Sequence, residues 1–385
     1  MKIFYDENMP FAYEFFNKFN GKSNELVPFK GRELTAQQVK DADVLLVRSI
    51  TKVNKHLLAQ NNVLKFVGTA TIGVDHIDQG YLSSRNTYFT AAPGCNAISV
   101  AEYVISSLVV LAERYLFTIT DKTVGIVGAG NTGTRLSEKL TALGVKHILC
   151  DPLLEKKRTE TGDTRTFHSL DEVLACDIIS LHVPLTKTGE HSTYHLLNQQ
   201  RLQSLTSEQI LINACRGEII DNQALLTLKQ QGMATKLVLD VWENEPNVLT
   251  ALIEFTEIAT AHIAGYSLEG KARGTEMLYQ ALCQQLEISP KKSLSDLLPP
   301  ANIEQIKINQ NFDEILLNQV VKMVYDVRRD DGLFRQQLSR FGFDYIRKTY
   351  PARREFSSVA ISTAKAKLDT LFQLGFMSVC KKEEE

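Results

Sequence analysis

The chain of 385 residues lacks an excess of charge of either sign. Its 43 lysines and arginines stand against 45 aspartates and glutamates, which gives a net charge of −2. This balance excludes the strongly basic surface that is typical of nucleic-acid binders and of proteins attracted to anionic membranes. We therefore expect neither nucleic acid nor a lipid surface as a partner.

The sequence also lacks long apolar runs and clustered cysteines. No run approaches the ~20 apolar residues that a membrane-spanning helix requires. The segment 1–8 carries acids where a secretory signal needs apolar residues, so we expect a cytoplasmic protein. The cysteines form no Cys-x-x-Cys pair and no group with histidine, which predicts free thiols in a reducing cytosol and no metal site. They are Cys95, Cys150, Cys176, Cys215, Cys283 and Cys380.

A glycine-rich turn lies between two predicted strands near the middle of the chain. Residues 123–133 read Thr-Val-Gly-Ile-Val-Gly-Ala-Gly-Asn-Thr-Gly, an apolar strand that runs into three glycines. A helix is expected over residues 131–143, and a second strand over residues 147–150 ends at Asp151. This order of elements is typical of a dinucleotide-binding βαβ unit. An ordinary βαβ turn without a ligand is the alternative.

Each residue of this pattern has a mechanical role. Gly128 permits the tight turn, Gly130 lets a pyrophosphate approach backbone N–H groups, and Gly133 lets the helix pack close to its strand. The Asp151 carboxylate can bind both ribose hydroxyls and would repel a 2′-phosphate, which predicts NAD rather than NADP. Three nearby cations are interpreted as a solvated polar loop: Lys156, Lys157 and Arg158.

The length exceeds what one core usually supports, so two or three domains are expected. The first ninety residues alternate helical stretches with predicted strands, at residues 2–5, 44–47, 65–67 and 88–91. A long helix, 97–117 with Asn96 as its N-cap, leads to the glycine-rich strand. Further strands follow that turn, which predicts a doubly wound sheet of six parallel strands; the later four are 177–181, 209–213, 237–241 and 257–260.

A second long helix, over residues 265–286, returns the chain to the first unit, which would then be discontinuous. Beyond a proline-containing linker, a small α+β domain is expected, with a strand at 305–308, a helix at 313–327 and an apolar segment at 366–379. The predicted α/β architecture therefore has three parts: residues 1–95 with 265–288, residues 96–264, and residues 289–385.

Three polar residues follow late strands of the predicted sheet: Arg216, Glu245 and His262. The carboxyl ends of parallel strands meet at one edge, where a doubly wound sheet binds its ligand. Histidine is the usual base near neutral pH, a carboxylate can orient it and stabilise the imidazolium, and arginine binds a substrate carboxylate through two hydrogen bonds. The set suits hydride transfer to NAD⁺ from a carbon that bears a hydroxyl group beside a carboxylate.

Taken singly, each of the three residues also has a plainer explanation. A lone histidine is more often a structural hydrogen-bonder, Glu245 before Pro246 is explicable as a loop acid, and Arg216-Gly217 as a surface turn. Only their joint placement at successive strand ends favours catalysis. The nicotinamide carries the redox chemistry, so no metal is needed.

Several motifs together resemble the D-isomer-specific 2-hydroxyacid dehydrogenases over roughly residues 1–288. They are Ala-Pro-Gly-Cys-Asn at 92–96, the glycine-rich turn, Asn-Ala-Cys-Arg-Gly at 213–217, Asp-Val-Trp-Glu-Asn-Glu-Pro at 240–246, and His262. The resemblance implies that Arg216, Glu245 and His262 are catalytic, and that the NAD-binding Rossmann domain is joined to a discontinuous, flavodoxin-like substrate domain. It also implies an NAD site made of Gly128, Gly130, Asn131, Thr132, Gly133, Asp151, Ala214, Cys215, Arg216, Asp240 and Gly265.

Finer motifs match one branch of that family across nearly the whole chain, including Val-Arg-Ser-Ile-Thr-Lys-Val-Asn at 47–54 and Tyr-Asp-Val-Arg-Arg-Asp-Asp at 325–331. The match implies a phosphorylated 2-hydroxy acid as substrate, a homodimer formed through the C-terminal domain, and three residues that contact substrate: Ser49, Thr69 and Tyr266. Candidate phosphate cations are Arg48, Lys271 and Arg273. Four more arginines would face a neighbouring subunit's cleft or form dimer salt bridges: Arg328, Arg329, Arg353 and Arg354.

Three alternatives stay open at this point. The chain could act on another phosphorylated hydroxy acid, such as 3-phosphoglycerate. It could be a non-catalytic NAD(H)-sensing dimer, although a sensor needs no base, arginine and carboxylate together. Its C-terminal domain could bind a regulatory small molecule instead of a second subunit.

Overall fold

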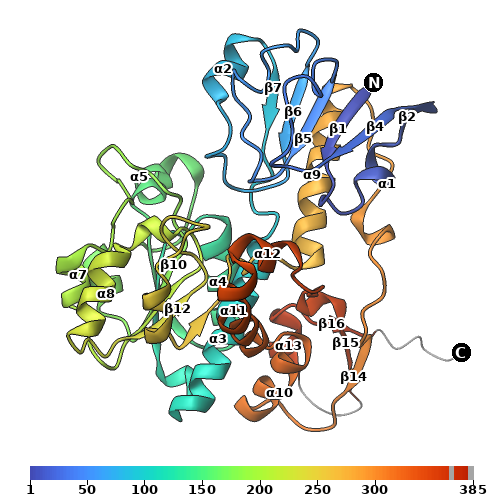
Figure 1. The fold of residues 1–385 in the computed structure, drawn as a ribbon. Helices are drawn as coiled ribbons and strands as arrows, with labels where there is room; N and C mark the ends of the chain where they lie inside the picture. The colour runs from blue at the N-terminus through green and yellow to red at the C-terminus, as the bar shows by residue number, and fades with distance from the viewer. Residues whose placement is uncertain (364–367, 380–385) are drawn as a thin grey trace, which may run out of the picture. The chain divides into compact units, whose positions relative to one another are not determined.

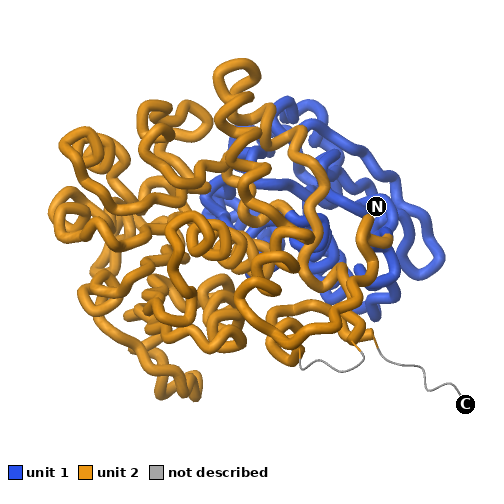
Figure 2. The backbone as a smooth tube through the Cα atoms, turned by 90° about the horizontal axis from the view of Figure 1, so that it is seen from below, with its two compact units in different colours: residues 1–96, 267–299 blue, residues 97–266, 300–385 orange. Residues whose placement is uncertain are grey.

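The computed structural model describes residues 1–363 and 368–379, and the chain divides into two units (Figure 2). Unit 1 consists of residues 1–96 and 267–299, and unit 2 of residues 97–266 with the described residues from 300 onward. The predicted break after residue 288 thus does not coincide with a boundary between these units. Residues 289–299 stay with the long helix because Tyr279 Oη accepts a hydrogen bond from the Lys291 amide. The division into three domains stays a prediction.

Unit 1 contains a five-stranded parallel sheet in the order β4-β1-β5-β6-β7 (Figure 1). This is the 2-1-3-4-5 order of flavodoxin-like folds, as predicted. The strands are β1 (Lys2–Asp6), β4 (Glu25–Phe29), β5 (Val44–Val47), β6 (Phe66–Thr69) and β7 (Tyr88–Thr90). The sequence analysis missed β4, because Pro28 interrupts its apolar residues and only an edge strand tolerates proline.

The remaining elements of unit 1 are short apart from one helix. A two-stranded hairpin joins β2 (Lys18–Phe19) to β3 (Lys22–Ser23). The long helix α9 (Leu268–Gln285) is capped by Ser267 and packs on β6, where Leu278 approaches Gly68 so closely that an added Cβ would lie 3.0 Å away. The other helical segments are α1 (Ala12–Phe16), α2 (Gln79–Ser84) and η4 (Leu294–Asp296).

Unit 2 contains a six-stranded parallel sheet in the order β13-β12-β11-β10-β8-β9. All six strands lie where the sequence predicts them: β8 (Thr123–Val127), β9 (Lys146–Cys150), β10 (Ile178–Leu181), β11 (Ile210–Asn213), β12 (Lys236–Leu239) and β13 (Ile258–Ala259). A single parallel bridge, Leu149 to Phe167, marks a further strand beyond β9. From β8 the chain first adds β9 on one side and then β10 on the other. The strand order thus reverses between β8 and β10, and such sheets bind their ligands at the carboxyl ends of the strands at this point.

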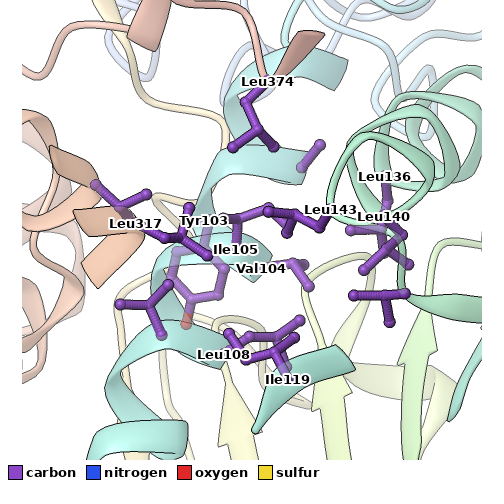
Figure 3. Close-up of a cluster of buried hydrophobic side chains, with 14 of the residues drawn as sticks. Tyr103, Val104, Ile105, Leu108, Ile119, Leu136, Leu140, Leu143, Leu317 and Leu374 are labelled. Carbon is purple, nitrogen blue, oxygen red and sulfur yellow. The ribbon is translucent and has the colours of Figure 1, made fainter. Parts of the chain in front are cut away.

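The core of unit 2 includes side chains from the C-terminal part of the chain. Figure 3 shows Tyr103 and Leu108 of α3 (Ala97–Tyr115) and Leu136 of α4 (Asn131–Ala142) in one cluster with Leu317 and Leu374. All five residues are buried, none of them more than 2% exposed. The C-terminal segment therefore shares its apolar core with the nucleotide fold.

That C-terminal segment combines a small parallel sheet with helices. The sheet order is β14-β15-β16, with β14 (Gln305–Lys307), β15 (Ala360–Ser362) and β16 (Met377–Ser378). The helices are α10 (Glu314–Val324), α11 (Val327–Phe341), α12 (Phe343–Lys348), α13 (Asp369–Gln373) and η5 (Phe356–Ser358). The predicted helix 313–327 is present as α10 but ends earlier than expected, at Val324, because Tyr325 is extended and Asp326 caps a new helix. Residues 366–367 of the predicted apolar segment, and Cys380, lie outside the described residues.

Two local predictions are also wrong. Lys156, Lys157 and Arg158 do not lie in a loop but in helix α5 (Pro152–Thr161), which Asp151 caps and Gly162 ends. Asn96 does not cap α3, because its buried Oδ1 has no hydrogen-bond partner. The remaining helical segments of unit 2 are η1 (Ile119–Asp121), α6 (Leu170–Leu174), α7 (Gln199–Gln203), η2 (Gly217–Ile219), α8 (Asn222–Gln230) and η3 (Thr250–Phe255).

Within the described part of the chain, the helices are too short or too polar to cross a membrane. The five cysteines that the structure describes are free thiols, as the spacing predicts.

Candidate active site

The glycine-rich turn has the geometry that a dinucleotide requires. Gly128 has a positive φ of 92°, and an added Cβ would lie 2.6 Å from the His182 carbonyl oxygen. A Cβ on Gly133 would lie 2.0 Å from the Gly128 carbonyl oxygen, so only glycine lets α4 approach β8 this closely. By contrast, a Cβ on Gly130 would meet nothing within 4 Å. The open space beside Gly130, at the N-terminus of α4, fits a pyrophosphate.

Asp151 ends β9 beside this turn. Its Oδ2 accepts a hydrogen bond from the Ala129 amide at 3.0 Å, and its Oδ1 caps α5 by accepting from Leu154 N at 3.1 Å. The carboxylate is thereby fixed at the position where the ribose hydroxyls of NAD would lie. Arg165, which the sequence analysis missed, donates to the Ala129 carbonyl oxygen at 2.8 Å and pairs with Asp163. No motif marked it, because it follows α5 in a segment without regular structure.

Arg216 follows β11 in a loop that is braced from both sides. Asn213 donates its side-chain amide to the Arg216 carbonyl oxygen at 2.9 Å and accepts from Cys215 N at 3.2 Å. An added Cβ on Gly217 would lie 1.9 Å from the carbonyl carbon of Trp242. The loop that carries Arg216 therefore touches the loop that leads to Glu245. Burial raises the pKa of the Cys215 thiol to about 11, so this cysteine is not a thiolate nucleophile.

Glu245 and His262 form a direct pair. Their atoms Oε2 and Nδ1 lie 2.7 Å apart, while Glu245 Oε1 accepts a hydrogen bond from Trp242 N at 3.0 Å. Burial opposes ionisation of Glu245, but the charges of His262 and Arg347 and the Trp242 hydrogen bond outweigh it and hold the pKa of the carboxyl below its usual value. An ionised Glu245 fixes the ring of His262 through Nδ1 and leaves Nε2 for a substrate.

Asp240 holds the backbone around His262. His262 has a positive φ of 56°, which is uncommon for a residue other than glycine. The buried Asp240 carboxylate accepts from Ile263 N at 2.8 Å and from Ala264 N at 2.9 Å, and from Thr260 Oγ1 at 2.6 Å. The resemblance assigned Asp240 to the cofactor, and these contacts give it a further role in presenting His262.

A second imidazole, missed in the sequence, fixes the loop before Glu245. His195 Nε2 lies 2.7 Å from Glu243 Oε1, and its Nδ1 lies 3.6 Å from Asp221 Oδ2. The other oxygen of Glu243 accepts from Asn222 N at 2.8 Å. Since Glu243 stands two residues before Glu245, these contacts restrain the loop that carries Glu245.

The predicted substrate contacts are distributed over both units. Ser49 is exposed beyond β5, and Thr69 is buried at the end of β6, where its hydroxyl lies 2.9 Å from His76 Nε2. Both residues belong to unit 1, as do all three candidate phosphate cations, Arg48, Lys271 and Arg273. Burial and the charge of Arg48 lower the pKa of Lys271 to about 8.

Other predicted cations have protein partners. Arg273 donates to the Cys95 carbonyl oxygen. Arg328 pairs with Asp326, and Arg329 pairs with Asp330. Arg354 is half-buried and also has an interaction partner within the chain.

The suggestion that Arg353 faces a neighbouring subunit is wrong. Arg353 is only 2% exposed and donates to the carbonyl oxygens of Ala264, at 2.9 Å, and of Ser99, at 2.5 Å. Tyr266, the third predicted substrate contact, lies close by in unit 2, where its hydroxyl accepts from Arg347 Nη2 at 2.8 Å. The C-terminal segment thus contacts the stretch that follows His262.

Comparisons with known proteins agree with this arrangement. Residues 109–264 match the NAD binding domain of the D-isomer specific 2-hydroxyacid dehydrogenases, and residues 297–375 match a domain of unknown function, DUF3410. The chain is 63% identical to erythronate-4-phosphate dehydrogenase of Colwellia psychrerythraea, with 98% of this chain and 99% of that protein covered. It is 54% identical to the Tolumonas auensis protein of the same name, over 98% and 99% of the two chains.

A solved structure gives the same fold. D-lactate dehydrogenase from Aquifex aeolicus, in complex with NAD and lactic acid, is similar with a TM-score of 0.60 and 25% sequence identity. The match covers 74% of this chain and 95% of that one.

Proposed function

The chain belongs to the erythronate-4-phosphate dehydrogenases of the D-isomer-specific 2-hydroxyacid dehydrogenase family, and we propose that its site performs their reaction as follows. NAD⁺ oxidises 4-phospho-D-erythronate to (R)-3-hydroxy-2-oxo-4-phosphooxybutanoate, a step of pyridoxal 5′-phosphate biosynthesis. The cofactor is NAD. The observation that carries the proposed mechanism is the contact of 2.7 Å between Glu245 Oε2 and His262 Nδ1. Both residues follow strands of the sheet that also carries the nucleotide turn.

In this mechanism, His262 Nε2 accepts the proton of the C2 hydroxyl group as the C2–H bond breaks. Glu245 stabilises the resulting imidazolium, and Arg216 binds the substrate carboxylate beside C2. NAD⁺, when bound, would supply the hydride acceptor. The pyrophosphate of NAD would be held at the start of α4, by Gly130, Asn131 and Thr132. Asp151 would bind the adenosine ribose. The rest of the nucleotide site would be formed by Ala214, Cys215, Asp240 and Gly265.

A substrate panel tests the function directly. The purified protein is incubated with NAD⁺ or NADP⁺ and with 4-phosphoerythronate or 3-phosphoglycerate, and NAD(P)H absorbance is followed. We expect NADH to form with 4-phosphoerythronate. The absence of NADH under conditions where calorimetry shows NAD binding would contradict the function, and faster turnover of 3-phosphoglycerate would assign the chain to a related activity.

The protein is proposed to act as a homodimer through its C-terminal segment. In support, exposed apolar side chains occur on neighbouring elements: Leu116 is 91% exposed after α3, and Ile315 and Met323 are exposed on α10. Phe117 and Ile315 also line one hollow of about 460 Å³. Light scattering should report a dimer for the wild-type protein and a monomer for Ile315→Asp.

Since NAD and reduced thiols occur together in the cytosol, we place the reaction there.

A further inference from the structure

Helix α12 brings a cation to the candidate active site from outside the matched NAD-binding domain. That domain match ends at residue 264, whereas Arg347 lies in the segment matched only by a domain of unknown function. Arg347 Nη2 donates a hydrogen bond of 2.8 Å to the hydroxyl of Tyr266, four residues after His262. Its charge also contributes to the lowered pKa of Glu245, after that of His262. Arg347 therefore lies within electrostatic reach of the catalytic pair.

The surroundings of Arg347 hold the side chain but do not neutralise it. The guanidinium stacks on the rings of Tyr266 and Phe343, at 5.4 and 5.9 Å from their centres. Its Nε is buried without a hydrogen-bond partner, while the side chain as a whole remains partly exposed. Among the residues that the structure describes, no carboxylate forms a salt bridge with Arg347, and Nη1 has no hydrogen-bond acceptor.

The acids near Arg347 are already engaged elsewhere. Glu245 is bound by His262 and the Trp242 amide, and Asp240 is bound by backbone amides of the His262 segment. Burial opposes the charge of Arg347, but Tyr266, Glu245, Asp240 and Asp344 outweigh it and raise its pKa above the usual value. The guanidinium is thus charged and only partly solvated. These acids act on it from a distance, so an anionic ligand would supply the direct ion pair that no carboxylate of the described residues forms with Arg347.

A second, buried arginine attaches the segment that carries Arg347 to the residues that follow His262. Arg353, six residues after Arg347, holds the Ala264 carbonyl oxygen at 2.9 Å. The same short C-terminal stretch therefore binds the chain on both sides of Gly265, at Ala264 and at Tyr266. This double attachment fixes the distance between Arg347 and the segment that carries His262.

We propose that Arg347 binds the phosphate group of the substrate, and that the C-terminal segment thereby completes the active site of its own chain. This proposal rests on the function proposed above. Arg216 takes the carboxylate next to the reacting carbon, so the second anionic end of a four-carbon phosphate needs a separate cation. Arginine suits a phosphate because its planar guanidinium keeps its charge and carries several N–H donors. Tyr266 accepts a hydrogen bond from Nη2 and so orients the guanidinium, which leaves the two N–H groups of Nη1 for the phosphate.

The test compares a phosphorylated and an unphosphorylated substrate. We expect Arg347→Gln to lower kcat/KM for 4-phosphoerythronate by about 10- to 100-fold, the range for losing a hydrogen bond to a charged group, and to change kcat/KM for erythronate less than about threefold. Arg347→Lys keeps the charge without the planar guanidinium and should recover part of the lost kcat/KM. Lys348→Gln, an exposed neighbour on α12, is the matched control and should leave both values unchanged.

Each outcome decides the proposal. Equal losses of kcat/KM on both substrates would leave their ratio unchanged and overturn phosphate binding, because Arg347 would then act only through Tyr266 or Glu245. No loss on either substrate would overturn it as well. Thermal unfolding identifies a misfolded Arg347→Gln protein, and the decision then rests on Arg347→Lys. If the wild-type protein turns over 3-phosphoglycerate instead of 4-phosphoerythronate, the proposed function fails, while 3-phosphoglycerate against glycerate still tests Arg347.

Discussion

Glu245 Oε2 lies 2.7 Å from His262 Nδ1, across 17 residues of sequence. The two residues come from different strand ends, and each is held by its own backbone contacts. Glu245 is fixed by the Trp242 amide, and His262 by the amides that Asp240 binds. The pair thus has one defined geometry, in which the second ring nitrogen of His262 is free to act on a substrate.

We expect His262→Asn to lower kcat by about 10²–10⁴-fold, the usual contribution of a general base. Asparagine is chosen because it tolerates the positive φ at this position better than most residues. Steady-state kinetics measures the loss, and calorimetry should show unchanged NAD affinity. A variant with near-normal turnover would remove His262 from the mechanism.

Glu245→Gln should also lower kcat, by about 10²-fold or more, because the neutral amide no longer stabilises the imidazolium. The amide oxygen retains the hydrogen bond with Trp242, so the loop should keep its place. Glu243→Gln serves as the comparison, because Glu243 contacts His195 rather than His262. If both variants lose activity equally, Glu245 has no special role beyond holding the loop.

Gly217→Ala should destabilise unit 2 by about 3 kcal/mol, because the new Cβ would overlap the Trp242 backbone at 1.9 Å. Relief of that overlap moves either the Arg216 loop or the Glu245 loop, so activity should fall as well. Gly332→Ala is the control, since its Cβ would meet nothing within 4 Å on helix α11 and alanine favours helix. Thermal unfolding should separate the two variants, and equal melting temperatures would contradict the close approach.

Asp151→Asn should reduce the preference for NAD over NADP by about tenfold, the effect of weakening a charged hydrogen bond and removing the repulsion of a 2′-phosphate. Asparagine can still cap α5 by accepting from Leu154 N. The measurement is the ratio of kcat/KM with the two cofactors. Asp171→Asn, an exposed acid in α6, is the control. An unchanged ratio would mean that Asp151 does not contact the ribose.

Burial of Glu102 predicts a pH dependence of stability. Burial raises the pKa of this carboxyl to about 7, although the charge of Lys139 opposes the shift. Between its ordinary value of 4.5 and about 7, the folded protein keeps a proton that the unfolded chain has released, so raising the pH lowers stability. A shift of this size corresponds to about 3 kcal/mol.

Glu102→Gln removes this titration and should flatten the fall in melting temperature between pH 5 and pH 7. The slope rather than the absolute melting temperature is the measure, because the substitution also alters the 3.3 Å hydrogen bond that Lys139 Nζ donates to Glu102. Parallel slopes for the wild-type protein and the variant would show that Glu102 stays ionised in the folded state.

The sequence by itself determined the nucleotide sheet and its cofactor turn. Apolar runs located all six strands of the nucleotide sheet, because strands buried on both faces admit few polar residues. The roles of Gly128 and Gly133 follow from steric limits that hold wherever the chain turns. The strand ends likewise marked Arg216, Glu245 and His262, since parallel strands end at a common edge.

Only the tertiary structure decided what lies against those residues. The edge strand β4 and the broken helix at Tyr325 depend on exposure and local capping, which alter the apolar pattern. Arg347 and His195 carry no motif, and their contacts join residues 81 and 48 positions apart in the sequence. A sequence shows which side chains are charged, but packing decides which charges meet. For that reason the choice of Arg347 as the phosphate-binding candidate rests on the contacts of α12.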